Sequence, residues 1–494
     1  MIRVPASLLL ASMVLAAQAQ QGPAIGRFGF DTTGMDLSVP PGDDIYAYAN
    51  GTWANSTPIP PDKSSVGQFT RLADINTARL REILDAERNR PASLAGAAYA
   101  SYLDAARVER LGMRPFKPVL DRIHAIRTRD DVMAASAEAW REGVAFPLSI
   151  VVDVDNGAPD RYVAVVSQAG LGMPDRSYYL DETAPMRKAR EAYLAYLTDV
   201  LDFLGESDAA RRAQDLLDFE TAVARDSWTP QRTRDAKAAY NPMSTDALSR
   251  ATPGFDVGAL LRRLGDRTGK VVVTQPDAVA AIAKRVGDAP IQVLRDALLV
   301  GEFHAYAQFL PSRAYAIDFA FFGQTIDGSD EAESRSTRAV AFAVAAVPDE
   351  VSRPYVARYF TPETKASAEA MVKEIIAAMD RRIDRLDWMT PATRSRAHAK
   401  LAAFTAKIGY PDRWHDYRGL ALKPDDLFGN ALRARRWQQA WNIGKAGKPP
   451  YRWEWSSTPM TVDAFADFPM IAITFPAAIL QPPFFDPHAD MAVN

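Results

Sequence analysis

The sequence predicts a mainly α-helical protein with a minor β component. Three observations support this: apolar residues recur at helical spacing over much of the chain, two Thr-Pro pairs mark helix starts, and β-branched runs are confined to two regions. The chain has 494 residues, of which 48% are apolar and 24% charged. That composition is typical of a globular protein, and the length allows about one to three domains.

The first 19 residues have the pattern of a signal peptide. Arg3 provides a positive end, residues 8–17 form a short apolar run, and residues 17–19 (Ala-Gln-Ala) have the small-x-small form of a cleavage site. We expect cleavage after Ala19, an exported protein that is periplasmic or secreted, and no membrane span after cleavage. The alternative is a short membrane anchor, but the apolar run is shorter than a bilayer-spanning helix.

The next elements follow from composition and periodicity. Residues 20–65 are rich in Gly, Pro, Asp and Ser, which predicts a mostly irregular lead-in. Apolar residues between Val66 and Asn89 have helical spacing, with Asn76 as a polar interruption. Residues 146–153 and 161–168 are β-branched runs separated by an Asp-Asn-Gly-Ala-Pro segment, and they predict a β-hairpin.

Two later helices have clear start signals. At 361–362 and 390–391, a Thr suited to capping the free amides of a first turn is followed by a Pro that needs no donor there. Both helices are expected to bury apolar stripes, the first with the residues Met371, Ile375, Met379 and Ile383. The second is expected to continue to Ile408 and to stop at Gly409. Residues 461–465 and 471–475 predict strands.

Charge and cysteine content exclude several kinds of function. The net charge is −3, so the chain lacks the basic surface of a nucleic-acid-binding protein. There is no cysteine, which excludes disulfides, thiol catalysis and cysteine-bound zinc. A nucleophile elbow and a P-loop are absent, and Gly170-Leu171-Gly172 lacks the third glycine of a dinucleotide fingerprint.

The histidines do not form a zinc motif. A helical zinc-peptidase motif needs two His four residues apart with a Glu after the first, HExxH. None of the five histidines has either neighbour, so each is interpreted as a surface or packed structural residue: His124, His304, His398, His415 and His488. From the residues alone, neither a catalytic set nor a metal site is predicted.

Six segments carry a specific resemblance to one family. They are residues 35–69 (MDLSVPPGDDIYAYANGTWANSTPIPPDKSSVGQF), 167–180 (SQAGLGMPDRSYYL), 219–230 (FETAVARDSWTP), 240–243 (YNPM), 386–414 (LDWMTPATRSRAHAKLAAFTAKIGYPDRW) and 475–485 (FPAAILQPPFF). In this order they resemble the neprilysin and endothelin-converting-enzyme family of zinc metallopeptidases. The resemblance covers roughly residues 29–494, and the lack of cysteine makes the chain similar to the bacterial, oligopeptidase O-like branch.

The resemblance implies a two-lobed fold that encloses a chamber for peptides. After the signal peptide (1–19) and an extended lead-in (20–41), residues 42–412 would form the large helical N-terminal lobe. Residues 413–460 would cross between lobes, and 461–494 would begin a thermolysin-like catalytic lobe. Zinc is the cofactor that the resemblance implies for full-length members. Their HExxH helix follows the FPAAILQPPFF segment, so the chain is expected to be truncated before it and to hold no zinc.

The resemblance also implies a substrate-binding edge strand at Asp463, Ala464 and Phe465. In the family this strand pairs with the backbone of an extended peptide. Members usually have Asn-Ala-Tyr or Asn-Ala-Phe here, and an asparagine amide can both donate and accept. Ionised Asp463 can only accept, and it would repel the carbonyls of a substrate.

The function expected from the resemblance is proteolysis of short peptides by a zinc endopeptidase. This chain is expected to be inactive by itself, because the zinc ligands and the general base are absent from its sequence. Two alternatives stay open. The chain could be a non-catalytic exported protein that binds peptides or a partner, or the product of a decayed or incomplete gene.

Overall fold

The computed structural model describes residues 22–494, and helices dominate it. Helices account for 54% of residues and strands for 7%, which confirms the mainly α prediction. The predicted signal peptide lies outside the described residues. The chain divides into two compact units: unit 1 contains residues up to Ser56 together with Leu480–Asn494, and unit 2 is Thr57–Ile479.

Unit 1 joins the two ends of the described chain. Residues 22–44 contain neither helix nor strand and lead into α1 (Ile45–Ser56). The Ala24 N–H donates to Asp486 Oδ2 at 2.6 Å, and the Asp490 N–H donates to the Phe28 carbonyl at 3.2 Å. Hydrogen bonds therefore tie the irregular lead-in to the last residues of the chain.

Unit 2 is mostly helical. Its first helices are α2 (Gln68–Glu87), α3 (Leu94–Leu103), α4 (Ala105–Leu111), η1 (Arg114–Phe116), α5 (Lys117–His124) and α6 (Arg129–Arg141). The middle of the chain adds α7 (Ser177–Leu180), α8 (Ala184–Phe203), α9 (Ala209–Asp226), α10 (Pro230–Thr233), α11 (Thr245–Ala251), α12 (Val257–Leu264), α13 (Pro276–Asp288) and α14 (Ile291–Tyr306). The remaining ones are η2 (Ala307–Phe309), α15 (Ser312–Phe319), the π-helix η3 (Ala320–Asp327), α16 (Arg335–Ala346), α17 (Pro348–Tyr359), α18 (Pro362–Ile383), α19 (Pro391–Ala402) and α20 (Leu427–Ile443). In the part of the chain that the structure describes, no helix has the length and apolar content needed to cross a membrane.

The predicted helix starts are confirmed. Thr361 caps α18 by accepting from the Thr364 N–H at 3.1 Å, and Thr390 caps α19 by accepting from the Thr393 N–H at 3.2 Å. The polar interruption in α2 also has a structural reason. Asn76 is buried, and its side-chain amide donates to the Met460 carbonyl at 2.7 Å. This bond ties α2 to the 442–460 segment.

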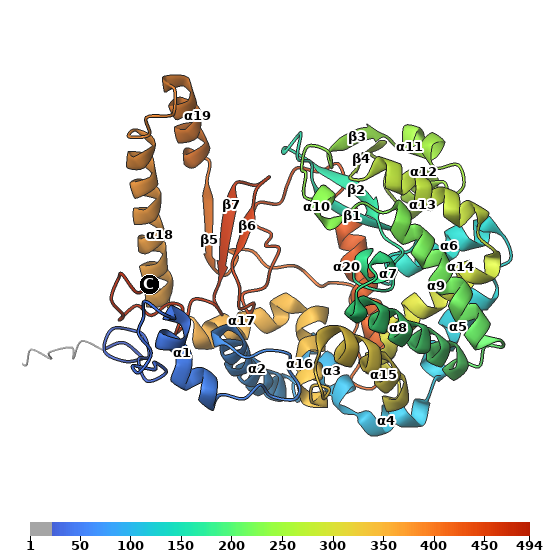
Figure 1. Cartoon of the computed structure of the whole chain (residues 1–494), viewed down its shortest axis with the longest axis horizontal. Helices are drawn as coiled ribbons and strands as arrows, with labels where there is room; N and C mark the ends of the chain where they lie inside the picture. Colours follow the sequence, from blue (N-terminus) through green and yellow to red (C-terminus); the bar gives the residue numbers. More distant parts are fainter. Residues whose placement is uncertain (1–21) are drawn as a thin grey trace, which may run out of the picture. The chain divides into compact units, whose positions relative to one another are not determined.

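Two expectations about α18 and α19 are wrong. The apolar stripe of α18 is not all core, since Ile375 is 58% exposed and Met379 is 47% exposed. Figure 1 shows α18 and α19 as an antiparallel pair beside β5, so much of the surface of α18 faces solvent. The second helix ends at Ala402, and Thr405–Gly409 is the strand β5 because it pairs with a strand near the end of unit 2.

The first sheet belongs to the helical body. Its strand order is β1 (Leu148–Val154), β2 (Tyr162–Gln168), β4 (Lys270–Val273), β3 (Asn241–Ser244). The predicted hairpin is confirmed, because β1 and β2 pair antiparallel with Leu148 opposite Gln168. β2 pairs parallel with β4, and β3 pairs antiparallel with β4.

The second sheet has the order β5-β7-β6, with β6 at Phe465–Asp467 and β7 at Ala472–Pro476. The predicted strand at 471–475 is confirmed as β7, whereas the one predicted at 461–465 begins only at Phe465. β5 and β7 run parallel, and β6 and β7 are antiparallel. A buried apolar cluster joins the hairpin of the first sheet to the second sheet, and its members are Val152, Val154, Tyr162, Met470 and Ala472.

Candidate peptide-binding edge and its supporting charge cluster

Strand β6 is the edge of the second sheet. Its three residues pair with β7 in the register Phe465 opposite Thr474 and Asp467 opposite Ala472. Among residues 22–494, β7 is the one strand that pairs with β6. The other side of β6 therefore presents backbone groups that an extended peptide could pair with.

A tight turn fixes the position of β6 against β7. The Asp467 carboxylate accepts from the Met470 N–H at 3.0 Å, and the Ile471 N–H donates to the Phe468 carbonyl at 3.2 Å. Ile471 adopts a φ of 50°, a left-handed conformation that a β-branched residue rarely takes. The side chain of Phe468 at this turn is 85% exposed.

The three sequence-predicted residues lie together at the start of this edge. Asp463 and Ala464 are exposed and precede the strand, and Phe465 is its first residue and half-buried. Asp463 Oδ1 accepts from the N–H of Ala464 at 2.7 Å. The carboxylate thus places a negative charge at the edge and occupies one amide donor.

A largely buried charge cluster is hydrogen-bonded to β5 of the second sheet, and we call it the His415 cluster. His415 Nδ1 contacts Asp349 Oδ2 at 2.8 Å, and its Nε2 contacts Glu454 Oε1 at 3.1 Å. Glu454 also accepts from Lys445 Nζ at 3.0 Å and from the Trp441 indole at 2.7 Å. The cluster connects α17, the segment after β5 and the end of α20.

A backbone carbonyl of the His415 cluster, that of Glu454, is hydrogen-bonded to the second sheet. Lys407 on β5 donates from Nζ to the Glu454 carbonyl at 2.9 Å. Burial lowers the pKa of Lys407, because the ammonium loses hydration there. β5 is therefore fixed to the backbone at Glu454 as well as to β7.

His415 is a partly buried imidazolium. Burial alone would disfavour its charge, but the hydrogen bonds with Asp349 and Glu454 outweigh it and raise the pKa of His415 to about 9. For Glu454, burial is outweighed by the bond from His415 and the charge of Lys445, and its pKa falls to about 2. Both partners are therefore ionised near neutral pH.

The free energy of unfolding is expected to fall as the pH rises from 6 to 10. The folded pKa of His415, about 9, lies above the unfolded value of 6.5, so its stabilising contribution is fully present below pH 6.5 and is lost as the pH passes about 9. The shift corresponds to a contribution on the order of 3 kcal/mol. Urea midpoints of the wild type and of His415→Gln across this range measure it, and the same pH slope in both proteins would contradict the assignment.

A metal ion requires several ligand side chains that converge on one point. No group of three or more His, Asp or Glu side chains in residues 22–494 is placed so that it could hold a metal ion. In the His415 cluster the imidazole lies between its two carboxylates and bonds to both, so these groups do not converge on a common point. No chemical step is therefore assigned to zinc within the described residues.

Comparison with known proteins agrees with this architecture. Residues 41–411 match the profile of peptidase family M13. Neprilysin-3 of Drosophila melanogaster is 28% identical over 93% of this chain and 63% of its own length. Human endothelin-converting enzyme-like 1 is 26% identical over 94% of this chain and 64% of its own length. The chain thus spans somewhat under two thirds of these relatives.

Solved structures give the same result. The zinc metalloprotease Zmp1 of Mycobacterium tuberculosis, crystallised with an inhibitor, matches with a TM-score of 0.90 and 34% identity, over 96% of this chain and 72% of that one. PepO from Lactobacillus rhamnosis HN001 matches with a TM-score of 0.83 and 25% identity, over 91% and 72% of the two chains. The fold is therefore that of the neprilysin-like metallopeptidases. The chain belongs to peptidase family M13, whose members are zinc metallopeptidases.

Sequence reasoning located the edge but missed the charged partners. The sequence indicates a surface or packed structural role for His415, and the structure shows it packed between two carboxylates that lie 66 and 39 residues away in sequence. Glu220 is a second missed group, buried in α9. It lies within the apolar stripe formed by Leu216, Leu217, Val223 and Ala224, and a lone Glu in such a stripe is the signal that could have found it.

Proposed function

We propose that this chain holds short peptides in an extended conformation for a zinc metallopeptidase, by adding them to the open edge of β6. The observation that carries the proposal is the unpaired side of β6, which begins at Phe465, the last of the three residues that the family resemblance assigns to the substrate strand. Membership of peptidase family M13 supports peptides as the ligand class. Backbone pairing at an edge suits short peptides of varied sequence, because main-chain groups supply the affinity.

In this proposal the chain positions the substrate and other residues of the full family architecture supply zinc. None of the 494 residues belongs to an HExxH motif, so this chain alone is expected to bind peptides without cleaving them. Elemental analysis is expected to find far less than one zinc per chain, and mass spectrometry is expected to find an incubated peptide intact. One tightly bound zinc per chain would overturn this assignment.

The lack of that motif also favours a second candidate, an exported protein that binds peptides without a catalytic role. Both candidates require peptide binding at β6. Only the first candidate predicts that the bound peptide is hydrolysed once a zinc-binding segment is supplied. Export follows from the predicted signal peptide. N-terminal sequencing of the protein from the extracytoplasmic fraction is expected to begin at Gln20, and an intact Met1 would contradict it.

Replacing Asp463 with asparagine is expected to tighten peptide binding roughly fivefold, a gain of about 1 kcal/mol. The substitution removes a negative charge that repels the carbonyls of an incoming peptide, and the new amide can donate to them. Fluorescence polarisation with a fluorescein-labelled, uncharged ten-residue peptide measures the dissociation constant.

The matched control is Asp387→Asn, which removes the same charge from an exposed residue in the α18–α19 connection. It is expected to leave peptide affinity unchanged. Equal gains in both variants would show a general charge effect and would remove the special role of Asp463. The absence of saturable binding in every variant would overturn the proposed function.

A further inference from the structure

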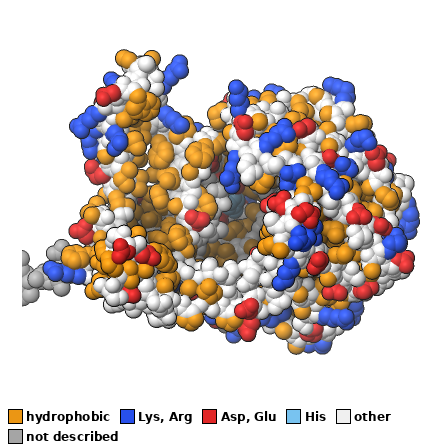
Figure 2. Space-filling view, in the orientation of Figure 1, with side chains coloured by type: hydrophobic (Ala, Val, Ile, Leu, Met, Phe, Trp, Pro, Cys, Tyr) orange, Lys and Arg blue, Asp and Glu red, His pale blue; other side chains and the backbone are white. Residues whose placement is uncertain are grey.

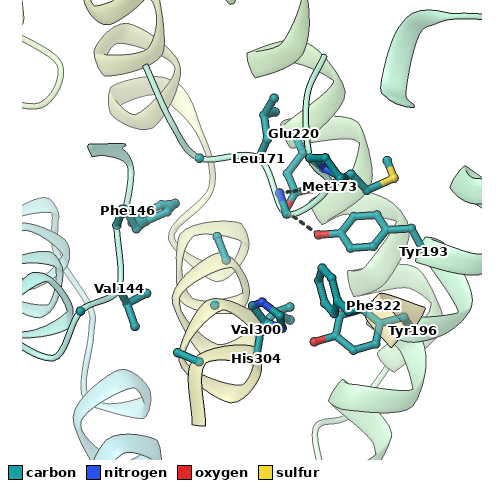
Figure 3. A pocket seen from close by; sticks show the side chains of 18 residues that line it. Val144, Phe146, Leu171, Met173, Tyr193, Tyr196, Glu220, Val300, His304 and Phe322 are labelled. Atoms are coloured by element: carbon teal, nitrogen blue, oxygen red, sulfur yellow. Dashed lines mark hydrogen bonds between the residues drawn. The ribbon is translucent and has the colours of Figure 1, made fainter. Parts of the chain in front are cut away.

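A separate cavity lies inside the helical body of unit 2. Its volume is about 420 Å3, within the range of pockets that hold small molecules. The α6–β1 and β2–α7 connections line it, together with α8, α9, α14 and η3. Figure 3 shows Val144 and Phe146 on one side of this space and Tyr193, Tyr196 and Phe322 on the other.

Small residues on one face of α14 keep the cavity open. Ala297, Gly301 and Ala305 line it at intervals of four residues, which places them in one row along the helix. A Cβ added at Gly301 would meet Val144 Cγ1 at 3.5 Å, an ordinary contact distance. Larger side chains in this row would therefore extend into the cavity and reduce its volume.

The floor of the cavity contains a buried carboxylate. Glu220 is 5% exposed and accepts from the Tyr179 hydroxyl at 2.6 Å, the Tyr193 hydroxyl at 3.1 Å and the Gly172 N–H at 3.3 Å. An ionised carboxylate has about four acceptor positions, so one remains for a ligand. Burial raises the pKa of Glu220 to about 7, which leaves it mostly ionised at pH 8.

The mouth of the cavity contains an oriented histidine. His304 is 47% exposed, and its ring lies 3.9 Å from that of Phe322, centroid to centroid. Its Nδ1 bonds to Asp318 Oδ1 at 2.7 Å, and that oxygen also accepts from the Tyr196 hydroxyl at 3.2 Å. Because a carboxylate only accepts, Nδ1 donates in this bond, and the Asp318 carboxylate fixes the orientation of the ring.

The lining combines acceptors and aromatic rings without a permanent positive charge. Four aromatic side chains line the cavity, and its lining residues include neither Lys nor Arg. Aromatic faces and a carboxylate attract cations, whereas an anion would meet repulsion from Glu220. An apolar lining with a few polar groups suits an amphipathic ligand.

We propose that this cavity binds a primary ammonium group attached to an apolar body about the size of an aromatic side chain. The ammonium lies against Glu220 at the floor, and the apolar body packs between the aromatic residues and the small-residue face of α14. Such a group belongs to a free arylalkylamine or to the first residue of a peptide. The site is separate from β6, so its occupancy does not depend on the proposed function.

The test uses isothermal titration of the purified chain at pH 8 with three probes. We expect 2-phenylethylamine to bind and 3-phenylpropionate, of nearly the same shape with the opposite charge, to bind at least tenfold more weakly. Phenylalanyl-glycine amide separates the two sources: binding equal to that of the free amine identifies a peptide terminus, and tenfold weaker binding identifies a free amine. No binding of either cation, or equal binding of the anion, overturns the proposal.

Variants link the binding to this cavity. Gly301→Leu fills the space and is expected to weaken 2-phenylethylamine binding at least tenfold, whereas Gly301→Ala is expected to change it less than threefold. Glu220→Gln removes the charge with little change of shape and is expected to weaken binding at least tenfold. Ala345→Leu adds the same bulk at an exposed site on α16 and is the control. Thermal melts show that each variant is folded, and equal affinity of folded Gly301→Leu would overturn the assignment.

Discussion

Replacing His415 with alanine is expected to lower the free energy of unfolding by about 3–4 kcal/mol. The substitution leaves Asp349 and Glu454, both largely buried, without the imidazolium between them. It also leaves a space beside Trp441 and Trp453, whose ring centroids each lie 5.1 Å from that of His415. Urea unfolding measures the loss of free energy, and tryptophan fluorescence follows the transition because Trp441 and Trp453 lie beside His415.

The chain offers a close control for this prediction. His398 also lies between two carboxylates, with Nδ1 at 2.6 Å from Asp380 and Nε2 at 3.0 Å from Asp384, but all three residues are in contact with solvent. His398→Ala is expected to move the urea midpoint far less, because water replaces the lost partners. Equal midpoints for the two variants would show that the burial of His415 has no energetic importance.

Replacing Glu220 with alanine is expected to cost about 3 kcal/mol of folding stability. The hydroxyls of Tyr179 and Tyr193 lose their acceptor, and each unsatisfied donor costs about 1–3 kcal/mol. The Gly172 N–H loses one of its two acceptors and keeps the Tyr179 hydroxyl at 3.0 Å. Water that enters the adjoining cavity reduces the total. The segment Gly170–Pro174 loses its link to α9 as well, so its amide hydrogens are expected to exchange faster.

Glu220→Gln is the matched control. It keeps an oxygen acceptor, and it resembles the protonated form that a carboxyl with a pKa of about 7 already populates near neutral pH. The expected loss is within about 1 kcal/mol, of the size of one ordinary hydrogen bond. Chemical denaturation of both variants tests the pair, and equal losses would show that hydrogen bonding to the Glu220 oxygens does not stabilise the fold.

The sequence predicts those elements whose signals are local. The hairpin of β1 and β2 and the caps of α18 and α19 each depend on residues within a few positions of one another. The boundary between α19 and β5 could not be found in this way. Residues 404–408 fit either a helix or a strand, and pairing with β7, about 67 residues further along the chain, decides between them.

The same distinction applies to the site. Asp463, Ala464 and Phe465 are predicted to bind substrate because their motif resembles that of a known family, and this role stays a prediction; Phe465 is the one of the three that lies in the edge strand. The His415 cluster and the hydrogen bonds of Glu220 depend on contacts across 27 to 66 residues of sequence, and periodicity contains no information about such pairs. The predicted burial of the α18 stripe failed for a different reason. An apolar pattern indicates a surface suited to burial, but it does not show whether another element covers that surface.

The open edge of β6 also affects how copies of this chain behave in concentrated solution. An unpaired strand can pair with the same strand of another molecule, but this one has only three residues, ends in Asp467 and begins two residues after Asp463. Two copies brought edge to edge would set four carboxylates against one another. We therefore expect the negative charges of Asp463 and Asp467 to weaken self-association through β6, as they weaken pairing with peptides. Gains in peptide affinity at Asp463 are accordingly expected to be accompanied by a greater tendency to self-associate.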